Sequence, residues 1–356
     1  MRDWRAKGRT TATVVLACVA VAAGVVGVSL MLEGDDSGPV ASSSADSGTA
    51  APYDGWRWES YQTIEIQVPE YWKYGTTGSP PCLVKEMRPP YVGRPGAKRA
   101  IGCRDPYPQL AHRASYLWFD AKSRNPTAEA RAADMGIATG SRTPGVRPAD
   151  HGWIEETRSV DGVLVTVLSD DDSLRQRILD SARVIDGKDV NGCTPDHPLA
   201  RTPQGRPAST GGLASIGSIE SIAVCRYAIA VGADKRNYIA GRRAPMIGSS
   251  MLTGKAAQAL VDAITAAPEG SGPNEQDCLD SYGSEVMVLT VHGSERDQEV
   301  LMRYNGCHFN GTDDGLTLRK LTSGILQPLL TGIHWQSTWI HPVYELVFGP
   351  TPPKGR

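Results

Sequence analysis

An uncharged, mostly apolar segment near the N-terminus places the strongest constraint on how this chain can fold. From Thr11 to Leu32, 22 residues carry no charge, and most are Val, Ala, Leu or Gly. At ~1.5 Å per residue, such a helix spans roughly 33 Å, enough for a hydrocarbon core of ~30 Å. Basic residues precede the segment and acidic residues follow it. We therefore predict a transmembrane helix over 11–32, with residues 1–10 cytoplasmic and the rest exported.

Two other interpretations of this segment are a cleaved signal peptide and a lipoprotein signal. A cleaved signal peptide has a shorter apolar stretch and a small-residue cleavage site, and 28–32 (VSLML) is a poor site. A lipoprotein would be lipidated at Cys18, because Val15-Leu16-Ala17-Cys18 is loosely similar to a lipobox. A lipidated Cys is normally followed by a polar tether, but here the apolar run continues for 14 residues. The anchor is the interpretation that we favour.

Composition then divides the exported part. Residues 33–54 are rich in Ser, Gly and Pro and cannot bury enough apolar surface to fold, which predicts a flexible linker with a reach of about 25 Å. After this linker the composition is that of a folded protein. We predict a first α+β domain over 55–187, a second α+β unit over 188–275, and a third unit with the C-terminal tail over 276–356.

Hydrophobic periodicity predicts the elements of the first domain. Alternation over 63–68 predicts a half-buried strand, 115–119 is a second candidate, and Asn125-Pro126 is typical of a helix start. Asp161-Gly162, between two apolar runs, predicts a two-residue hairpin turn. The spacing of Ser173 and Gln176 matches a capping box. The helix predicted there carries Leu174, Ile178, Ala182 and Ile185 on one face.

The second and third units show a common order of elements. Residues 219–229 form a predicted strand, and Thr253 is the expected cap of an amphipathic helix. Residues 286–304 form a predicted hairpin, and Thr322 is the expected cap of the last helix. We interpret this shared order as a degenerate duplication. The alternative is that two small α+β units are similar by chance.

Cysteine usage fits an exported protein. Six of the seven Cys follow the predicted anchor, and an even number outside the membrane predicts three disulfides. No two are spaced as C-x-x-C, which argues against zinc-finger and thioredoxin-like sites. The cysteines fall two per unit, so pairing neighbours is the connectivity that we favour among the 15 that six cysteines allow. The pairs are Cys82–Cys103, Cys193–Cys225 and Cys278–Cys307.

No catalytic or cofactor motif is evident. The nucleophile elbow, the H-E-x-x-H zinc motif, the P-loop and the dinucleotide fingerprint are all missing from the sequence. Residues 310–315 (NGTDDG) are similar to a calcium loop, but Leu321 stands where such loops need a bidentate Glu. Formal net charge is −2, which argues against nucleic acid as a partner. We therefore expect no catalytic residue, no metal and no cofactor.

An aromatic-rich segment supplies the candidate binding residues. Residues 53–74 hold Trp56, Trp58, Trp72 and four Tyr, whereas the whole chain has three Phe. Trp56 and Trp58 lie two apart, so on a strand they share a face and could stack on a sugar or a peptide. The alternative is that these aromatics form the core of the domain that begins there.

Several short stretches carry a resemblance to known sequences. They are 157–163 (TRSVDGV), 224–227 (VCRY), 252–254 (LTG), 266–268 (AAP), 303–307 (RYNGC), 313–315 (DDG) and 321–322 (LT). Together they resemble uncharacterised single-pass exported proteins of high-GC actinobacteria, over most of 55–333. The resemblance implies origin and location, and it transfers no activity and no site residue.

These observations lead to one expectation about function. We expect a membrane-anchored extracytoplasmic binding or adaptor protein of the cell envelope, with an envelope protein or a wall glycan as its partner. The alternative is an envelope hydrolase whose site is assembled from residues distant in sequence.

Overall fold

The computed structural model describes residues 52–75, 89–95, 107–121, 143–202, 205–209, 211–229, 243–275, 283–335 and 340–350. All of them belong to one compact unit, Thr49–Arg356. The predicted anchor, residues 33–51 of the linker and the helix expected from Asn125 lie outside these residues, as do Cys82, Cys103 and Cys278. Within the described ranges, no helix is long and apolar enough to cross a membrane.

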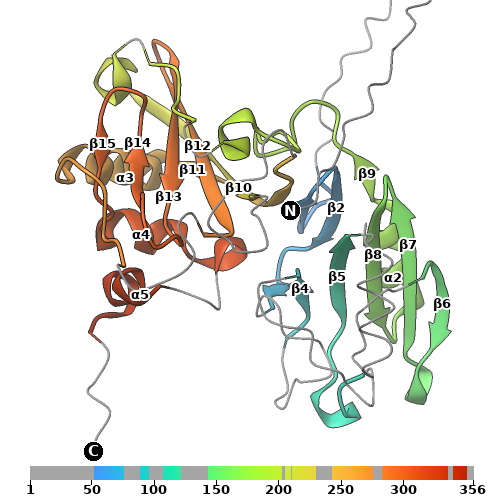
Figure 1. Ribbon diagram of the computed structural model, residues 1–356. Coiled ribbons are helices and arrows are strands. Elements are labelled where there is room, and N and C mark those ends of the chain that lie inside the picture. The colour runs from blue at the N-terminus through green and yellow to red at the C-terminus, as the bar shows by residue number, and fades with distance from the viewer. Residues whose placement is uncertain are drawn as a thin grey trace, which may run out of the picture. The chain divides into compact units, whose positions relative to one another are not determined.

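The fold mixes α and β structure, with three sheets built mostly of antiparallel strands (Figure 1). The three-stranded sheet has the order β1-β2-β9, from β1 (Trp56–Tyr61), β2 (Ile64–Pro69) and β9 (Arg183–Val184). One six-stranded sheet has the order β3-β4-β5-β8-β7-β6, from β3 (Lys73–Tyr74), β4 (Tyr91–Gly93), β5 (Tyr116–Ala121), β8 (Val163–Ser169), β7 (Ile154–Val160) and β6 (Gly145–Pro148).

The other six-stranded sheet has the order β11-β10-β12-β13-β14-β15, from β11 (Met246–Thr253), β10 (Ile219–Ala228), β12 (Glu285–Gly293), β13 (Asp297–Arg303), β14 (Gly311–Asp313) and β15 (Leu318–Arg319). The α-helices of the described part are α2 (Asp172–Asp180), α3 (Gly254–Ala266), α4 (Ser323–Leu329) and α5 (His341–Phe348). Short 3-10 helices are η2 (Leu110–His112), η3 (Asp150–Gly152), η4 (Pro198–Arg201), η5 (Gly212–Ser215) and η6 (Gly332–His334).

The first two sheets share a core with α2. Apolar side chains of β2, β5 and β8 pack together there against Ile178 and Leu179 of the helix. The alternation over 63–68 predicts a strand with one open face, but every residue of β2 is buried. The reason is that its polar residues are also covered: Glu65 pairs with Arg183, and the backbone N–H of Gln67 donates to Ser181 Oγ.

The hairpin turn between β7 and β8 lies where the sequence predicts it. Asp161 and Gly162 both have positive φ, at 46° and 79°, as a type I′ turn requires. The helix that follows differs from the prediction. Asp171, not Ser173, caps α2, because its carboxylate accepts from Leu174 N at 3.0 Å. The helix ends at Asp180, and the chain then forms β9 against β2, so Ala182 and Ile185 are not helical.

Residues from both later units build the remaining sheet. β10 pairs with β12 at its centre, and α3 and α4 pack side by side against one face (Figure 1). The apolar faces of both helices lie in that core, as expected for amphipathic helices. Thr253 and Thr322 are the N-cap residues as expected, but neither side chain makes a capping hydrogen bond. β11, β14, β15 and α5 have no predicted counterpart in the sequence.

Candidate functional site

Two of the three candidate tryptophans lie together on the three-stranded sheet. Trp58 is opposite Gln67 and Trp56 is opposite Pro69 in the β1–β2 register, so both indoles lie on the same face. Both are half-buried, and Tyr53, 44% exposed, lies beside Trp56 with ring centroids 5.7 Å apart. We call Tyr53, Trp56 and Trp58 the aromatic strip.

Trp72 does not join this strip. It is 2% exposed and lies in the core shared by β2, β5 and β8. Its ring packs against apolar side chains, which is the core alternative that the sequence left open for these aromatics. The candidate binding residues therefore divide into two half-buried ones on one face, of which Trp56 also packs against this core, and one in the interior.

Two arginines cover the aromatic strip. The guanidinium carbon of Arg177, on α2, lies 4.3 Å from the ring centroid of Tyr53 and 4.5 Å from that of Trp56. The guanidinium of Arg183, on β9, lies 4.0 Å from the ring centroid of Trp58 and pairs with Glu65 at 2.6 Å. Cations over the faces of aromatic rings are attracted by the ring quadrupole. The strip thus combines apolar rings with positive charge, which no sequence signal at 177 or 183 indicates.

The opposite face of β1 is a buried ionic cluster that holds the strand in place. Glu59, 1% exposed, pairs with Arg57 at 2.7 Å and with Arg94 at 2.6 Å. Burial alone would lower the pKa of Arg57, but the charge of Glu59 together with Tyr74 raises it overall. Burial, and then the negative charge of Glu59, raises the pKa of Tyr74. β1 is therefore anchored from its inner face, which leaves the aromatic strip on a fixed backbone.

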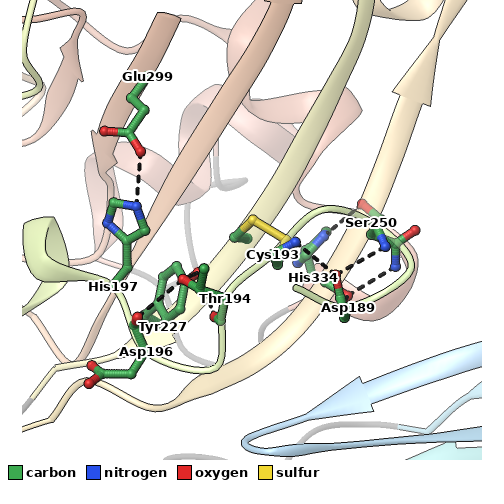
Figure 2. The surroundings of a disulfide bond; sticks show 12 residues. Asp189, Cys193, Thr194, Asp196, His197, Tyr227, Ser250, Glu299 and His334 are labelled. Atoms are coloured by element: carbon green, nitrogen blue, oxygen red, sulfur yellow. Dashed lines mark hydrogen bonds and ion pairs between the residues drawn. A yellow bond between two sulfur atoms is a disulfide. The ribbon is translucent and has the colours of Figure 1, made fainter. Parts of the chain in front are cut away.

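A second polar region surrounds the Cys193–Cys225 disulfide, which the sequence predicts (Figure 2). Asp189, almost fully buried, accepts from Cys193 N at 2.8 Å, from Asn191 N at 3.0 Å and from the hydroxyl of Ser249. Tyr227 donates to the carbonyl of Thr194 at 2.9 Å. Cys307 is also disulfide-bonded. Each polar group named here is satisfied by the chain itself, which indicates a structural role for this region.

A serine and a histidine 84 residues apart meet beside this region (Figure 2). Ser250 Oγ lies 2.9 Å from His334 Nε2, and His334 is 3% exposed. Burial, and then the positive charges of Arg226 and Arg94, hold the pKa of His334 well below its ordinary value. A neutral imidazole next to a hydroxyl can act as a general base. However, His334 Nδ1 has no hydrogen-bond partner within the described ranges, so no carboxylate orients the ring.

The loop that is similar to a calcium site uses its carboxylates internally. Asp313 accepts from Arg206 at 2.7 and 2.8 Å, and Asp314 accepts from the backbone N–H groups of Leu213 and Thr317. Across the residues that the structure describes, no group of His, Cys, Asp and Glu is arranged to hold a metal ion. This loop is explained as a hydrogen-bonded turn.

A cavity of about 570 Å³ opens elsewhere, between residues 271–274, the β15–α4 junction and α5. Lys320 and Glu345 are its charged lining residues, and the Ser250–His334 pair does not line it.

Comparison with known proteins identifies no relative: no family model, no curated protein and no solved structure matches the chain. The functional interpretation rests on the geometry described above.

Proposed function

We propose that this chain is a membrane-anchored binding protein of the cell envelope that holds a wall glycan on its aromatic strip. The observation that carries the proposal is the placement of Trp56 and Trp58 on one face of the three-stranded sheet, with Tyr53 beside them. Indole and phenol rings are apolar with a polar edge, and the parts of these rings that the two arginines leave exposed are suited to contact the apolar faces of sugars. A fixed strand keeps the entropic cost of binding low.

The location that we propose follows from the sequence. Residues 11–32 form the single span, residues 1–10 are cytoplasmic, and residues 33–54 tether the folded part outside the membrane. A reach of about 25 Å would hold the aromatic strip close to the wall polymers that surround the membrane. The disulfide at Cys193–Cys225 fits an oxidising compartment.

We further propose that 188–275 and 276–356 are two copies of one ancestral unit. Each contributes two antiparallel strands and a later helix, β10, β11 and α3 in one unit and β12, β13 and α4 in the other, with β14 and β15 inserted before α4. The strand order β11-β10-β12-β13, in which the two units meet at the antiparallel β10–β12 pair, supports the proposal. The disulfide cysteines differ, because Cys225 lies within β10 whereas Cys307 follows β13.

Co-sedimentation of the full-length, detergent-solubilised protein with insoluble wall glycan tests the proposed function. We expect the wild type to sediment with the glycan, and the double variant W56A/W58A to bind about tenfold more weakly or less. Tyr344→Ala is the matched control, since it removes an exposed ring on α5, outside the strip. Near-UV circular dichroism confirms that each variant is folded. Absence of wild-type binding, or undiminished binding by W56A/W58A, contradicts the proposal.

The alternative function is an envelope hydrolase, and the Ser250–His334 contact is the observation that favours it. A serine activated by a neutral histidine reacts with fluorophosphonate probes. Labelling of Ser250 in the full-length protein, abolished by His334→Gln, would support the hydrolase over the binding protein. We expect no labelling, because His334 Nδ1 has no orienting partner within the described ranges.

The other proposed partner is an envelope protein. Cross-linking in intact cells, with the W56A/W58A variant beside the wild type, tests whether such a protein binds the aromatic strip.

A further inference from the structure

Arg177 is an exposed cation placed on two aromatic rings. It lies in the last turn of α2, and its guanidinium carbon is within 4.5 Å of the ring centroids of both Tyr53 and Trp56. The two rings meet edge to face, with an interplanar angle of 85°. The guanidinium is therefore held at the exposed end of the aromatic strip.

The charge of Arg177 is not neutralised within the described ranges, whereas its neighbours are paired. Arg175, two residues earlier and on the buried side of α2, pairs with Glu156 and Asp172. Arg183, on the same strip, pairs with Glu65. Arg177 forms no ion pair and no side-chain hydrogen bond with any described residue. Of the two arginines on the strip, Arg183 therefore has an anionic partner, and Arg177 has none among the described residues.

A guanidinium held against aromatic rings is well suited to bind an oxyanion. Contact with the rings uses none of its N–H groups as hydrogen-bond donors, and those donors match a carboxylate or a phosphate in a bidentate geometry. Because the rings restrict the side chain, less conformational entropy is lost when the anion binds. A lysine at this position would supply charge without the planar fork.

We propose that the glycan bound on the aromatic strip is acidic, and that Arg177 binds its oxyanion while the strip contacts the neighbouring sugar rings. This inference rests on the proposed function and names the ligand chemistry of the same site. The oxyanion is either the carboxylate of an acidic sugar or a phosphodiester that joins the sugars of a sugar-phosphate polymer. These two sources share the geometry that Arg177 recognises and are separated by the experiment.

The test measures binding of three soluble polymers of matched length to the full-length protein in detergent micelles. One polymer is a neutral glycan, one contains hexuronic acids, and one is a sugar-phosphate polymer with phosphodiester links between hexoses. We expect at least one acidic polymer to bind about tenfold more tightly than the neutral one at 0.1 M salt, the magnitude of one charge-assisted hydrogen-bonded contact. Whichever acidic polymer binds more tightly identifies the source of the oxyanion.

Variants then assign the preference to Arg177. Arg177→Gln should abolish the acidic preference and retain neutral binding, and Arg177→Lys should lose most of the preference despite its charge. Lys255→Gln, which removes an exposed positive charge from α3, is the control and should retain the preference. Equal wild-type binding of neutral and acidic polymers overturns the role of Arg177 and leaves the proposed function intact. Binding of no polymer overturns both. An acidic preference that persists in Arg177→Gln also overturns the role of Arg177.

Discussion

At the scale of single residues, some buried carboxylates are satisfied by several partners, whereas the buried imidazole of His334 is satisfied at one nitrogen only. Asp189 accepts three hydrogen bonds, and Asp314 accepts from backbone groups of two different loops. His334 is equally buried, but only its Nε2 has a described partner. A residue of this kind makes stability depend on pH, because burial disfavours its charged form.

We predict that His334 destabilises the fold under acid conditions. Its folded-state pKa lies well below 6.5, so below about pH 6.5 the unfolded chain binds a proton that the folded chain does not. The free energy of unfolding should then fall with decreasing pH by up to about 1.4 kcal/mol per unit. Urea unfolding at pH 8 and pH 5.5 should show a smaller decrease in His334→Gln than in the wild type.

A second buried group with a shifted pKa, Glu285, is unchanged between the wild type and His334→Gln. Burial raises its pKa above 4.5, so its contribution has the opposite sign: it is lost as pH rises from 4.5 through the folded-state pKa. The difference between wild type and His334→Gln therefore isolates the histidine. Equal losses of stability in the two proteins would show that His334 is not responsible.

At the scale of elements, a buried carboxylate adds polar links between α2 and its sheet to the apolar packing of Ile178 and Leu179. Glu156, on β7, accepts from Arg158 at 2.9 Å, from Arg175 at 3.1 Å and from Gln176 at 2.7 Å. Burial would raise the pKa of Glu156, but these donors lower it overall. We predict that Glu156→Gln lowers the free energy of unfolding by about 3 kcal/mol, because Arg175 is buried and loses a partner. Asp180→Asn, which removes an exposed partner of Arg158, should cost less than about 1 kcal/mol in the same urea titration. Similar losses in both variants would contradict this assignment.

The elements that the sequence predicts correctly are those set by residues close together in the chain, such as a turn dipeptide or an apolar spacing. Asp161-Gly162 defines its hairpin turn because few other dipeptides adopt two positive φ angles. The buried stripe of α3 follows from its spacing alone. Pairing between distant strands leaves no such local signal. β9 pairs with β2, more than a hundred residues away in the sequence, and this pairing makes α2 end earlier than its apolar pattern indicates. The spacing of Trp56 and Trp58 is a local signal, so the sequence predicts that they share a face. The position of Arg177 beside Trp56 is a long-range contact, so the sequence does not predict it.

At the scale of the whole molecule, the disulfides and the anchor make a joint prediction. Cys193 and Cys225 are bonded, Cys307 is oxidised, and the remaining exported cysteines are expected to be paired. If residues 11–32 stay attached as a span, Cys18 is then the single free thiol of the seven cysteines. Maleimide labelling of the denatured, unreduced protein from cells should add one label, and labelling after reduction should add seven. A cleaved signal peptide would remove Cys18 and a lipid would block it, so either gives no label before reduction. Two or more labels before reduction would show that the exported cysteines are not all paired, which would contradict the three-disulfide prediction.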